Sequence, residues 1–341
     1  MIKRLLAFTI LALGLGSSSA LHADGSIVER SLEMPSAALG RPVRYSVYLP
    51  AGYSGETRRY PVVYLLHGFG GDERSFFDDG DLQDVADELI ATAKLPPSII
   101  VTPSGQKGWY VDNDVTGRWQ TALLDDLIDG VDGKYRTIPS REGRAIAGYS
   151  MGGYGALRFA LLEPDRFVAA GSLSGALFPD VKSASDFPAF QLGLFGRAFG
   201  ASFDPKAFNA ASPWRSLSTN AAAADAPALY MSVGDDDIKI LLAGNNAFDR
   251  ALATAKIPVT YHVVPGQHNW KLWSSELAPM LSFIGDRLEE ATPVATANPA
   301  KRVADRVEAA AKVERVGAPA VPGAPVVQPT TPSKTTILAR P

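Results

Sequence analysis

The chain has 341 residues, of which 46% are hydrophobic and 20% are charged, and its formal net charge is −3 at pH 7. This is the composition of a globular protein, and it excludes collagen-like, coiled-coil and wholly disordered chains. The absence of cysteine excludes disulfide scaffolds, thiolate metal sites, iron–sulfur clusters and a cysteine nucleophile. Any nucleophile in this protein must therefore carry oxygen or nitrogen.

Residues 1–23 have the pattern of a secretory signal peptide. Lys3 and Arg4 precede an apolar run over 5–16, and small residues follow up to the expected cleavage region. A buried first helix is the alternative interpretation. No later stretch approaches the roughly 18 apolar residues that span a bilayer. We therefore expect an exported protein, periplasmic or secreted, with no stable membrane insertion after cleavage.

Residues 24–290 alternate short β-rich runs with longer helical ones, which predicts an α/β domain with a mainly parallel twisted sheet and helices on both faces. The stretch of about 176–225 interrupts this alternation and is expected to form an irregular cap or insertion. The predicted strands are Arg44–Leu49, Val62–Leu66, Ser98–Thr102, Ala145–Tyr149, Phe167–Ser172, Ala228–Val233 and Val259–Val264. The predicted helices are Leu82–Ala93, Thr121–Val131, Met151–Leu162, Ile240–Ala255 and Trp273–Arg287.

Residues 291–341 form a basic segment rich in proline and alanine. They contain eight prolines and no Phe, Trp or Tyr, so we expect a mostly disordered tail. The tail carries a net charge of +4, whereas residues 24–290 carry 24 basic and 33 acidic side chains, a net charge of −9. An acidic domain argues against nucleic acid as a partner, because binding to phosphates draws on basic groups.

A nucleophile turn is predicted where the strand ending at Tyr149 meets a helix. The sequence Gly148-Tyr149-Ser150-Met151-Gly152 has the G-x-S-x-G spacing, which places a serine on a sharp strand-to-helix turn. Glycine is needed at both ends because a side chain there would collide with neighbouring backbone. Ser150 is thus the candidate nucleophile, and the Met151 N–H is a candidate donor to an oxyanion. A structural glycine-rich turn is the alternative.

A serine hydroxyl needs a base, usually a histidine held by a carboxylate. Where the serine lies on such a turn, the chain order is serine, acid, histidine, which eliminates His67 as the base. His262 lies inside a predicted strand, where a structural role is the better interpretation. His268 follows that strand in a loop, and its position favours it as the base.

The acid is expected after an earlier strand, and Asp235, Asp236 and Asp237 directly follow the predicted strand Ala228–Val233. Position alone leaves all three open. A calcium site is the competing interpretation of three consecutive carboxylates, although the spacing of an EF-hand loop is absent.

The second oxyanion donor is expected in the loop after an early strand. His67-Gly68-Phe69-Gly70-Gly71 follows the strand Val62–Leu66, and its glycines allow the backbone to approach a substrate carbonyl. The Phe69 N–H is the candidate donor alongside that of Met151. A purely structural glycine-rich loop is the alternative.

These segments together resemble the esterase D family of α/β hydrolases, which includes feruloyl and acetyl-xylan esterases, S-formylglutathione hydrolases and mycolyltransferases. The resemblance implies the α/β-hydrolase fold, and its Gly-x-x-Asp pattern selects Asp237 as the acid and its histidine motif selects His268. It covers most of 36–290. It rests on Leu65–Gly71, Trp109–Asp112, Arg144–Ala156, Gly234–Asp237 and Gly266–Trp270.

The sequence therefore predicts an exported serine carboxylic-ester hydrolase that acts on small acyl, aryl or sugar esters through an acyl-serine. No metal or organic cofactor is expected. Trp109, Tyr110 and Trp270 are the candidate substrate-binding residues, because aromatic rings suit aryl esters and sugars. An acyltransferase that moves an acyl group to a sugar or other alcohol is the first alternative, and a non-catalytic binding protein on the hydrolase fold is the second. Export disfavours a role in cytosolic glutathione metabolism.

Overall fold

The computed structural model describes residues 25–220 and 226–288. The predicted signal peptide, the last residues of the predicted cap and the predicted tail lie outside these ranges. Within them, no helix is long and apolar enough to cross a membrane.

An eight-stranded sheet forms the centre of the domain, with strand order β1-β2-β4-β3-β7-β8-β9-β10. The first three strands in this order pair antiparallel, and every pair from β4 to β10 is parallel. This confirms the predicted mainly parallel sheet. Its strands are β1 (Ile27–Met34), β2 (Val43–Leu49), β3 (Val62–Leu66), β4 (Ile99–Pro103), β7 (Arg144–Tyr149), β8 (Ala169–Leu173), β9 (Ala228–Gly234) and β10 (Val259–Val264).

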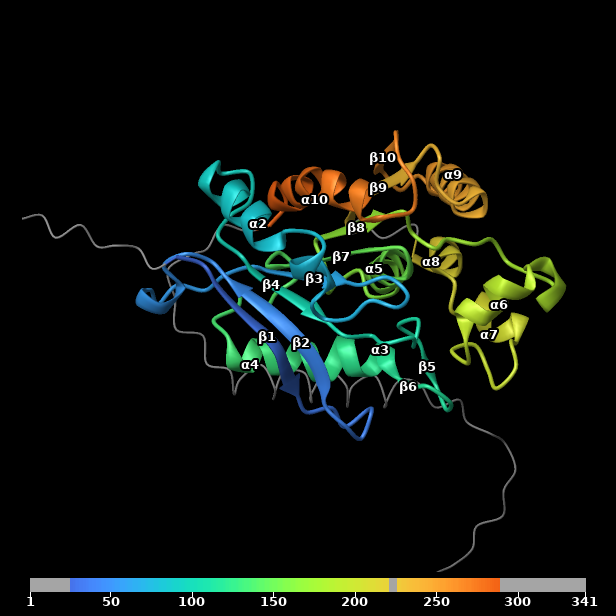
Figure 1. Ribbon diagram of the computed structural model, residues 1–341, viewed down its shortest axis with the longest axis horizontal. Helices are drawn as coiled ribbons and strands as arrows, with labels where there is room; N and C mark the ends of the chain where they lie inside the picture. The colour runs from blue at the N-terminus through green and yellow to red at the C-terminus, as the bar shows by residue number, and fades with distance from the viewer. Residues whose placement is uncertain (1–24, 221–225, 289–341) are drawn as a thin grey trace, which may run out of the picture. The chain divides into compact units, whose positions relative to one another are not determined.

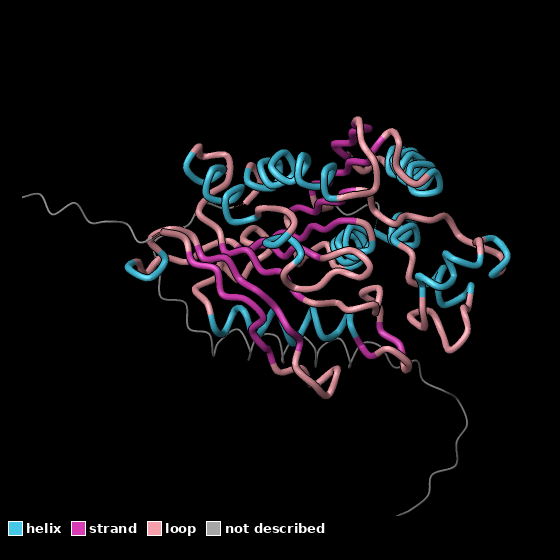
Figure 2. Tube along the Cα trace, viewed as in Figure 1, coloured by secondary structure: helices cyan, strands magenta, loops and turns pink. Residues whose placement is uncertain are grey.

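Helices cover both faces of this sheet, as Figures 1 and 2 show. In Figure 1, α2 and α10 lie on one face, and α3 and α4 lie on the other. The helical elements are η1 (Tyr53–Gly55), α1 (Ser75–Asp78), α2 (Leu82–Ala91), α3 (Trp119–Thr121), the π-helical η2 (Ala122–Leu127), α4 (Ile128–Lys134), α5 (Met151–Leu162), η3 (Ala184–Asp186), α6 (Ala189–Phe195), α7 (Pro205–Ala210), α8 (Pro213–Asn220), α9 (Lys239–Thr254) and α10 (Trp270–Gly285).

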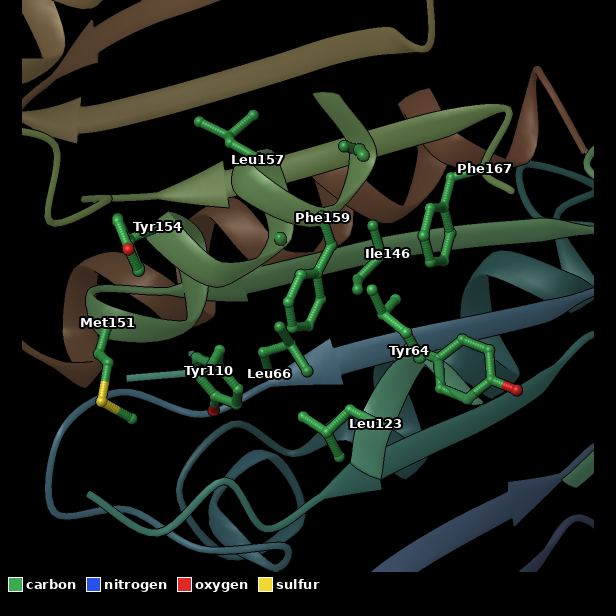
Figure 3. Close-up of a cluster of buried hydrophobic side chains, with 14 of the residues drawn as sticks. Tyr64, Leu66, Tyr110, Leu123, Ile146, Met151, Tyr154, Leu157, Phe159 and Phe167 are labelled. Carbon is green, nitrogen blue, oxygen red and sulfur yellow. The ribbon is translucent and has the colours of Figure 1, made fainter. Parts of the chain in front are cut away.

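The central strand β3 shows why the sheet needs cover on both faces. Successive side chains of a strand point to opposite faces, and all five residues of β3 are buried. Tyr64 and Leu66 belong to the apolar cluster that includes α5 and η2, whereas Val63 and Leu65 belong to the cluster that includes α2 and α10. Figure 3 shows part of the first cluster, where Leu66 lies near Tyr110 and Phe159.

All seven predicted strands and all five predicted helices are present, with ends within three residues of the prediction. β1 and the short antiparallel pair β5 (Asp112–Asn113) and β6 (Gly117–Arg118) were not predicted. β1 is an edge strand whose alternation is broken, because Ser31 has a φ of 53° and the register shifts between Glu29 and Leu32. A bulged, half-exposed edge strand lacks the periodic signal on which the other predictions rest.

The segment between β8 and β9 carries η3, α6, α7 and α8 and contains no strand in its described part. We call residues 176–220 the cap segment. Its short helices enclose an aromatic cluster in which neighbouring ring centroids lie 4.9–6.4 Å apart. The rings are those of Phe178, Phe187, Phe195, Phe199, Phe203 and Phe208.

Candidate active site

Ser150 lies on a strained turn between β7 and α5. Its backbone has φ 55° and ψ −118°, a conformation that L-residues rarely adopt. A Cβ at Gly152 would lie 1.9 Å from the Leu66 carbonyl oxygen, and one at Gly148 would lie 2.6 Å from the same atom. Close packing of α5 against β3 thus requires both glycines and fixes the serine at the carboxyl end of the sheet.

A chain of hydrogen bonds joins Ser150, His268 and Asp237. His268 Nε2 lies 2.9 Å from Ser150 Oγ, and His268 Nδ1 lies 2.9 Å from Asp237 Oδ1. The carboxylate accepts the Nδ1 proton, so Nε2 is left to accept the hydroxyl proton of the serine. The Asp237 side chain is fully buried, whereas that of His268 is 18% exposed. This arrangement is the hydrogen-bond geometry of a serine nucleophile with its base and orienting acid.

The three consecutive carboxylates each bind a successive residue of the loop that carries His268. Asp235 Oδ1 accepts the Gly266 N–H at 3.0 Å, and Asp236 Oδ2 accepts from the Gln267 side-chain amide at 2.7 Å. Asp237 Oδ1 accepts from His268. The parallel strands β9 and β10 end side by side, so the acidic residues after β9 face the loop after β10. Their hydrogen bonds hold that loop in place.

The structure includes no calcium-like arrangement at these carboxylates within the residues it describes. No group of three or more His, Asp or Glu side chains there is close enough to hold a metal ion. One oxygen of each of Asp235, Asp236 and Asp237 instead accepts from an N–H donor of the facing loop.

The loop after β3 lies against the serine. A Cβ at Gly68 would be 3.2 Å from Ser150 Cβ, so this stretch of backbone passes directly beside the nucleophile. Among the described residues, the N–H groups of Phe69 and Met151 have no backbone acceptor. Two unpaired N–H groups on either side of a serine can receive the negative charge of a tetrahedral intermediate.

His67 holds this loop from inside the protein rather than facing a substrate. The side chain is 1% exposed; its Nδ1–H donates to the Gly68 carbonyl at 2.7 Å, and its Nε2 accepts the Gly105 N–H at 2.9 Å. The Tyr110 hydroxyl donates to the His67 carbonyl at 2.8 Å. Burial lowers the pKa of His67 below its ordinary value of 6.5. A neutral His67 thus links the loop at Gly68 to the loop at 105–110.

A cavity of about 230 Å³ opens beside Ser150 and His268. Most of its wall is apolar or aromatic, and it is formed by the loop after β3, the cap segment and the start of α9. Leu194 and Ile238 also line the cavity. They are 40% and 47% exposed, so part of its apolar wall is in contact with solvent. The other lining residues are Gly68, Phe69, Trp109, Tyr149, Ala176, Phe178, Gln191, Phe195, Ile240, Leu241 and Trp273.

The three candidate substrate-binding aromatics lie in different places. Trp109 lines the cavity, and its indole N–H donates to the Leu194 carbonyl at 2.9 Å. Tyr110 is fully buried and holds His67, and it is not among the lining residues. Trp270 packs against Phe76 and Tyr149, also outside the lining.

Four residues that line the cavity were not predicted as site residues: Gln191, Leu194, Ile238 and Leu241. Gln191 and Leu194 lie in α6 of the cap segment, whereas Ile238 and Leu241 lie at the start of α9. Tertiary packing brings them to one cavity, and no local motif encodes that. His262, the rejected base, lies exposed on β10, with its ring 5.7 Å from that of Tyr230.

The family described as "Putative esterase" matches residues 36–284 of the chain. The chain belongs to the esterase family. The match includes Ser150, Asp237, His268 and the loop after β3, so the hydrogen-bonded residues described above all lie within the matched range. The fold is that of the α/β hydrolases.

Relatives in this family differ in length and in the reactions their names state. Esterase Rv1288 of Mycobacterium tuberculosis is 32% identical over 255 residues, which are 68% of this chain and 54% of that protein. The chain thus spans about half the length of that relative. The diacylglycerol acyltransferase/mycolyltransferase Ag85B of Mycobacterium avium is 27% identical over 308 residues, which are 79% of this chain and 86% of that protein.

Solved structures show the same fold. A ferulic acid esterase aligns with a TM-score of 0.66 and 27% identity over 78% of this chain and 100% of its own. The MPT51 protein of Mycobacterium tuberculosis aligns with a TM-score of 0.63 and 21% identity, covering 77% of this chain and 99% of its own.

Proposed function

We propose that this protein is a serine ester hydrolase that works through an acyl-serine intermediate. The observation that carries the proposal is the hydrogen-bonded chain Asp237–His268–Ser150, with both bonds at 2.9 Å and the serine on a strained turn. Membership of the esterase family supports the same reaction class. A small-molecule ester is the proposed partner.

The proposed reaction assigns a role to each of these groups. Ser150 Oγ attacks the ester carbonyl carbon while its proton passes to His268 Nε2, and Asp237 stabilises the resulting imidazolium. The N–H groups of Phe69 and Met151 bind the carbonyl oxygen as it becomes negative. The C–O bond to the alcohol then breaks, and the His268 proton goes to the departing oxygen. Water, deprotonated by His268, releases the acid and restores the serine.

The Ser150→Ala variant tests this proposal. Because the variant keeps the cavity and the histidine but has no nucleophile, kcat/KM for p-nitrophenyl acetate should fall by several orders of magnitude. A fluorophosphonate should label the wild type and leave the variant unlabelled. His262→Gln, an exposed histidine on β10, is the matched control and should keep its activity. Wild-type turnover in Ser150→Ala would refute the proposal.

Acyl transfer to an alcohol is the second candidate, and the similarity to the mycolyltransferase Ag85B favours it. Both reactions share the acyl-serine, so they differ only in what attacks it. Product analysis with a sugar or alcohol acceptor in excess separates them, since a transferase forms the new ester in preference to the free acid.

We also propose that the protein is exported. The support is the sequence pattern of residues 1–23, with two basic residues before an apolar run. N-terminal sequencing of the mature protein tests this, and an intact Met1 on the exported chain would contradict cleavage.

A further inference from the structure

Two backbone hydrogen bonds join Ser150 to the end of β8 and to the loop that follows it. The Ser150 N–H donates to the Leu173 carbonyl at 2.8 Å, and the Ala176 N–H donates to the Ser150 carbonyl at 3.0 Å. A residue keeps a strained conformation such as that of Ser150 only where its surroundings hold it there. Residues 174–177, where β8 leads into the cap segment and which we call the β8 loop, are therefore part of what holds the serine on its turn.

The β8 loop has an uncommon backbone conformation of its own. Ser174 has a φ of 48°, and its N–H donates to the Ser232 carbonyl on β9 at 2.7 Å. The Leu177 N–H donates to the Gly175 carbonyl at 2.8 Å, which closes a tight turn two residues later. Because Ser174 lies in the left-handed region, the loop depends on contacts with other elements to keep its shape.

The side chain of Asn245, on α9, supplies one of these contacts. Its Nδ2 donates to the Gly175 carbonyl of the β8 loop and to the Leu241 carbonyl one turn earlier in α9, both at 2.8 Å. Since both partners are carbonyl oxygens, the NH₂ group of the amide faces them. The bond within the helix fixes the rotamer of the side chain, so the amide meets the β8 loop in one orientation.

Asn245 is fully buried in the interior of α9. Asparagine is a poorer helix former than leucine, and a buried amide costs free energy unless it is hydrogen-bonded, so packing alone does not favour this residue here. The preceding residue brings α9 against the same loop, because a Cβ at Gly244 would lie 1.9 Å from the Leu177 carbonyl oxygen. Close backbone contact and the amide therefore act together on the β8 loop.

We propose that Asn245 is a positioning residue for the proposed nucleophile, which it holds through the β8 loop. The inference rests on the proposed function, since it concerns the same reaction. Without the Nδ2 donor the Gly175 carbonyl is free to shift, and the neighbouring Ala176 N–H, which holds the Ser150 carbonyl, shifts with it. Misplacing a reacting group by about 1 Å can cost roughly 100-fold in rate, so the loss belongs to the chemical step.

The variant Asn245→Leu tests this proposal, because it keeps the approximate size of the side chain and removes the amide. In single turnovers with enzyme in excess, p-nitrophenol release from p-nitrophenyl acetate measures acylation of the serine. The maximal rate should fall roughly 10- to 100-fold, whereas the enzyme concentration that gives half of this rate should change less than about threefold. Asn245→Ala is the second variant, should the first fold poorly by circular dichroism, and it should show the same loss.

Two control variants on the same helix separate positioning from stability. Asn246→Leu removes the neighbouring amide, whose Oδ1 accepts the Tyr261 hydroxyl at 2.8 Å, and should keep the wild-type rate. Phe248→Leu leaves a space at a fully buried ring, so it should lower the urea midpoint while the folded protein keeps its acylation rate. A rate loss in Phe248→Leu equal to that in Asn245→Leu would assign the effect to stability and overturn the inference.

Labelling separates this inference from the proposed function. If a fluorophosphonate labels Ser150 in the wild type and both Asn245 variants release p-nitrophenol at the wild-type rate, the role of Asn245 alone is overturned. If the reagent does not label the wild type, the result counts against the serine mechanism itself.

Discussion

The buried His67 makes the stability of the loop after β3 depend on the pH of the solution. It is neutral in the folded protein because burial lowers its pKa, whereas in the unfolded chain it titrates near 6.5. As the pH falls below about 6.5, the unfolded state takes up a proton that the folded state does not. The free energy of unfolding therefore decreases by up to about 1.4 kcal/mol per pH unit from this group.

The variant His67→Gln should lack the part of the pH dependence of the unfolding free energy that comes from His67. At pH 7.5 it should be less stable than the wild type by about 1–3 kcal/mol, because hydrogen bonds to Gly68 and Gly105 are lost. Urea unfolding between pH 7.5 and 5 should then show the gap narrowing as the pH falls. His262→Gln controls for removing a histidine as such. Parallel curves for the wild type and His67→Gln would show that His67 does not carry this proton linkage.

Much of the candidate site was predictable from single residues because its motifs are local. Strand β7, the sharp turn at Ser150 and helix α5 are contiguous in the chain, so glycine spacing and hydrophobic periodicity reveal them together. Asp237 required more, since the position after β9 left three carboxylates open until the family pattern chose among them. Gln191 and Leu194 gave no signal, because they lie beside Ser150 only through the tertiary packing of the cap segment.

A hydrogen bond of Asp235 joins the turn after β9 to the loop after β10. Its Oδ1 accepts the Gly266 N–H two residues before His268, and Asp235 is not among the residues that line the cavity, so we expect it to position the proposed base. Asp235→Ala should therefore lower kcat roughly 3- to 10-fold with little change in KM, on the scale of one hydrogen bond.

The conservative variant Asp235→Asn distinguishes positioning from charge. An amide oxygen can still accept the Gly266 N–H, so Asp235→Asn should recover most of the kcat lost in Asp235→Ala. Steady-state kinetics on p-nitrophenyl acetate measure both, with the exposed Asp84→Ala on α2 as a control for the loss of a carboxylate. Equal losses in the two Asp235 variants would assign the effect to charge instead.

Across the whole domain, the elements with a regular hydrophobic pattern were predicted, and those without one were not. Central strands such as β3 and β9 are nearly continuous apolar runs because helices cover both sides of them. β1 pairs only on one side and bends at Ser31, so its sequence carries little periodicity. The cap segment contains short helices stabilised by mutual packing of phenylalanines, and helices of six to eight residues have weak local signals.

The aromatic cluster of the cap segment is part of the same apolar core as α5 and one face of the sheet. This continuity predicts a single cooperative unfolding transition. Phe195 and the α5 residue Leu157 belong to the same apolar cluster. The cap segment should therefore unfold together with the sheet, and activity, tryptophan fluorescence and far-UV circular dichroism should follow one urea curve. Phe195→Ala should shift that whole curve by about 3–5 kcal/mol, whereas the half-buried Phe203→Ala should shift it less. Loss of activity at a lower urea concentration than loss of circular dichroism would show that the cap segment unfolds first and that the cavity depends on a separately stabilised element.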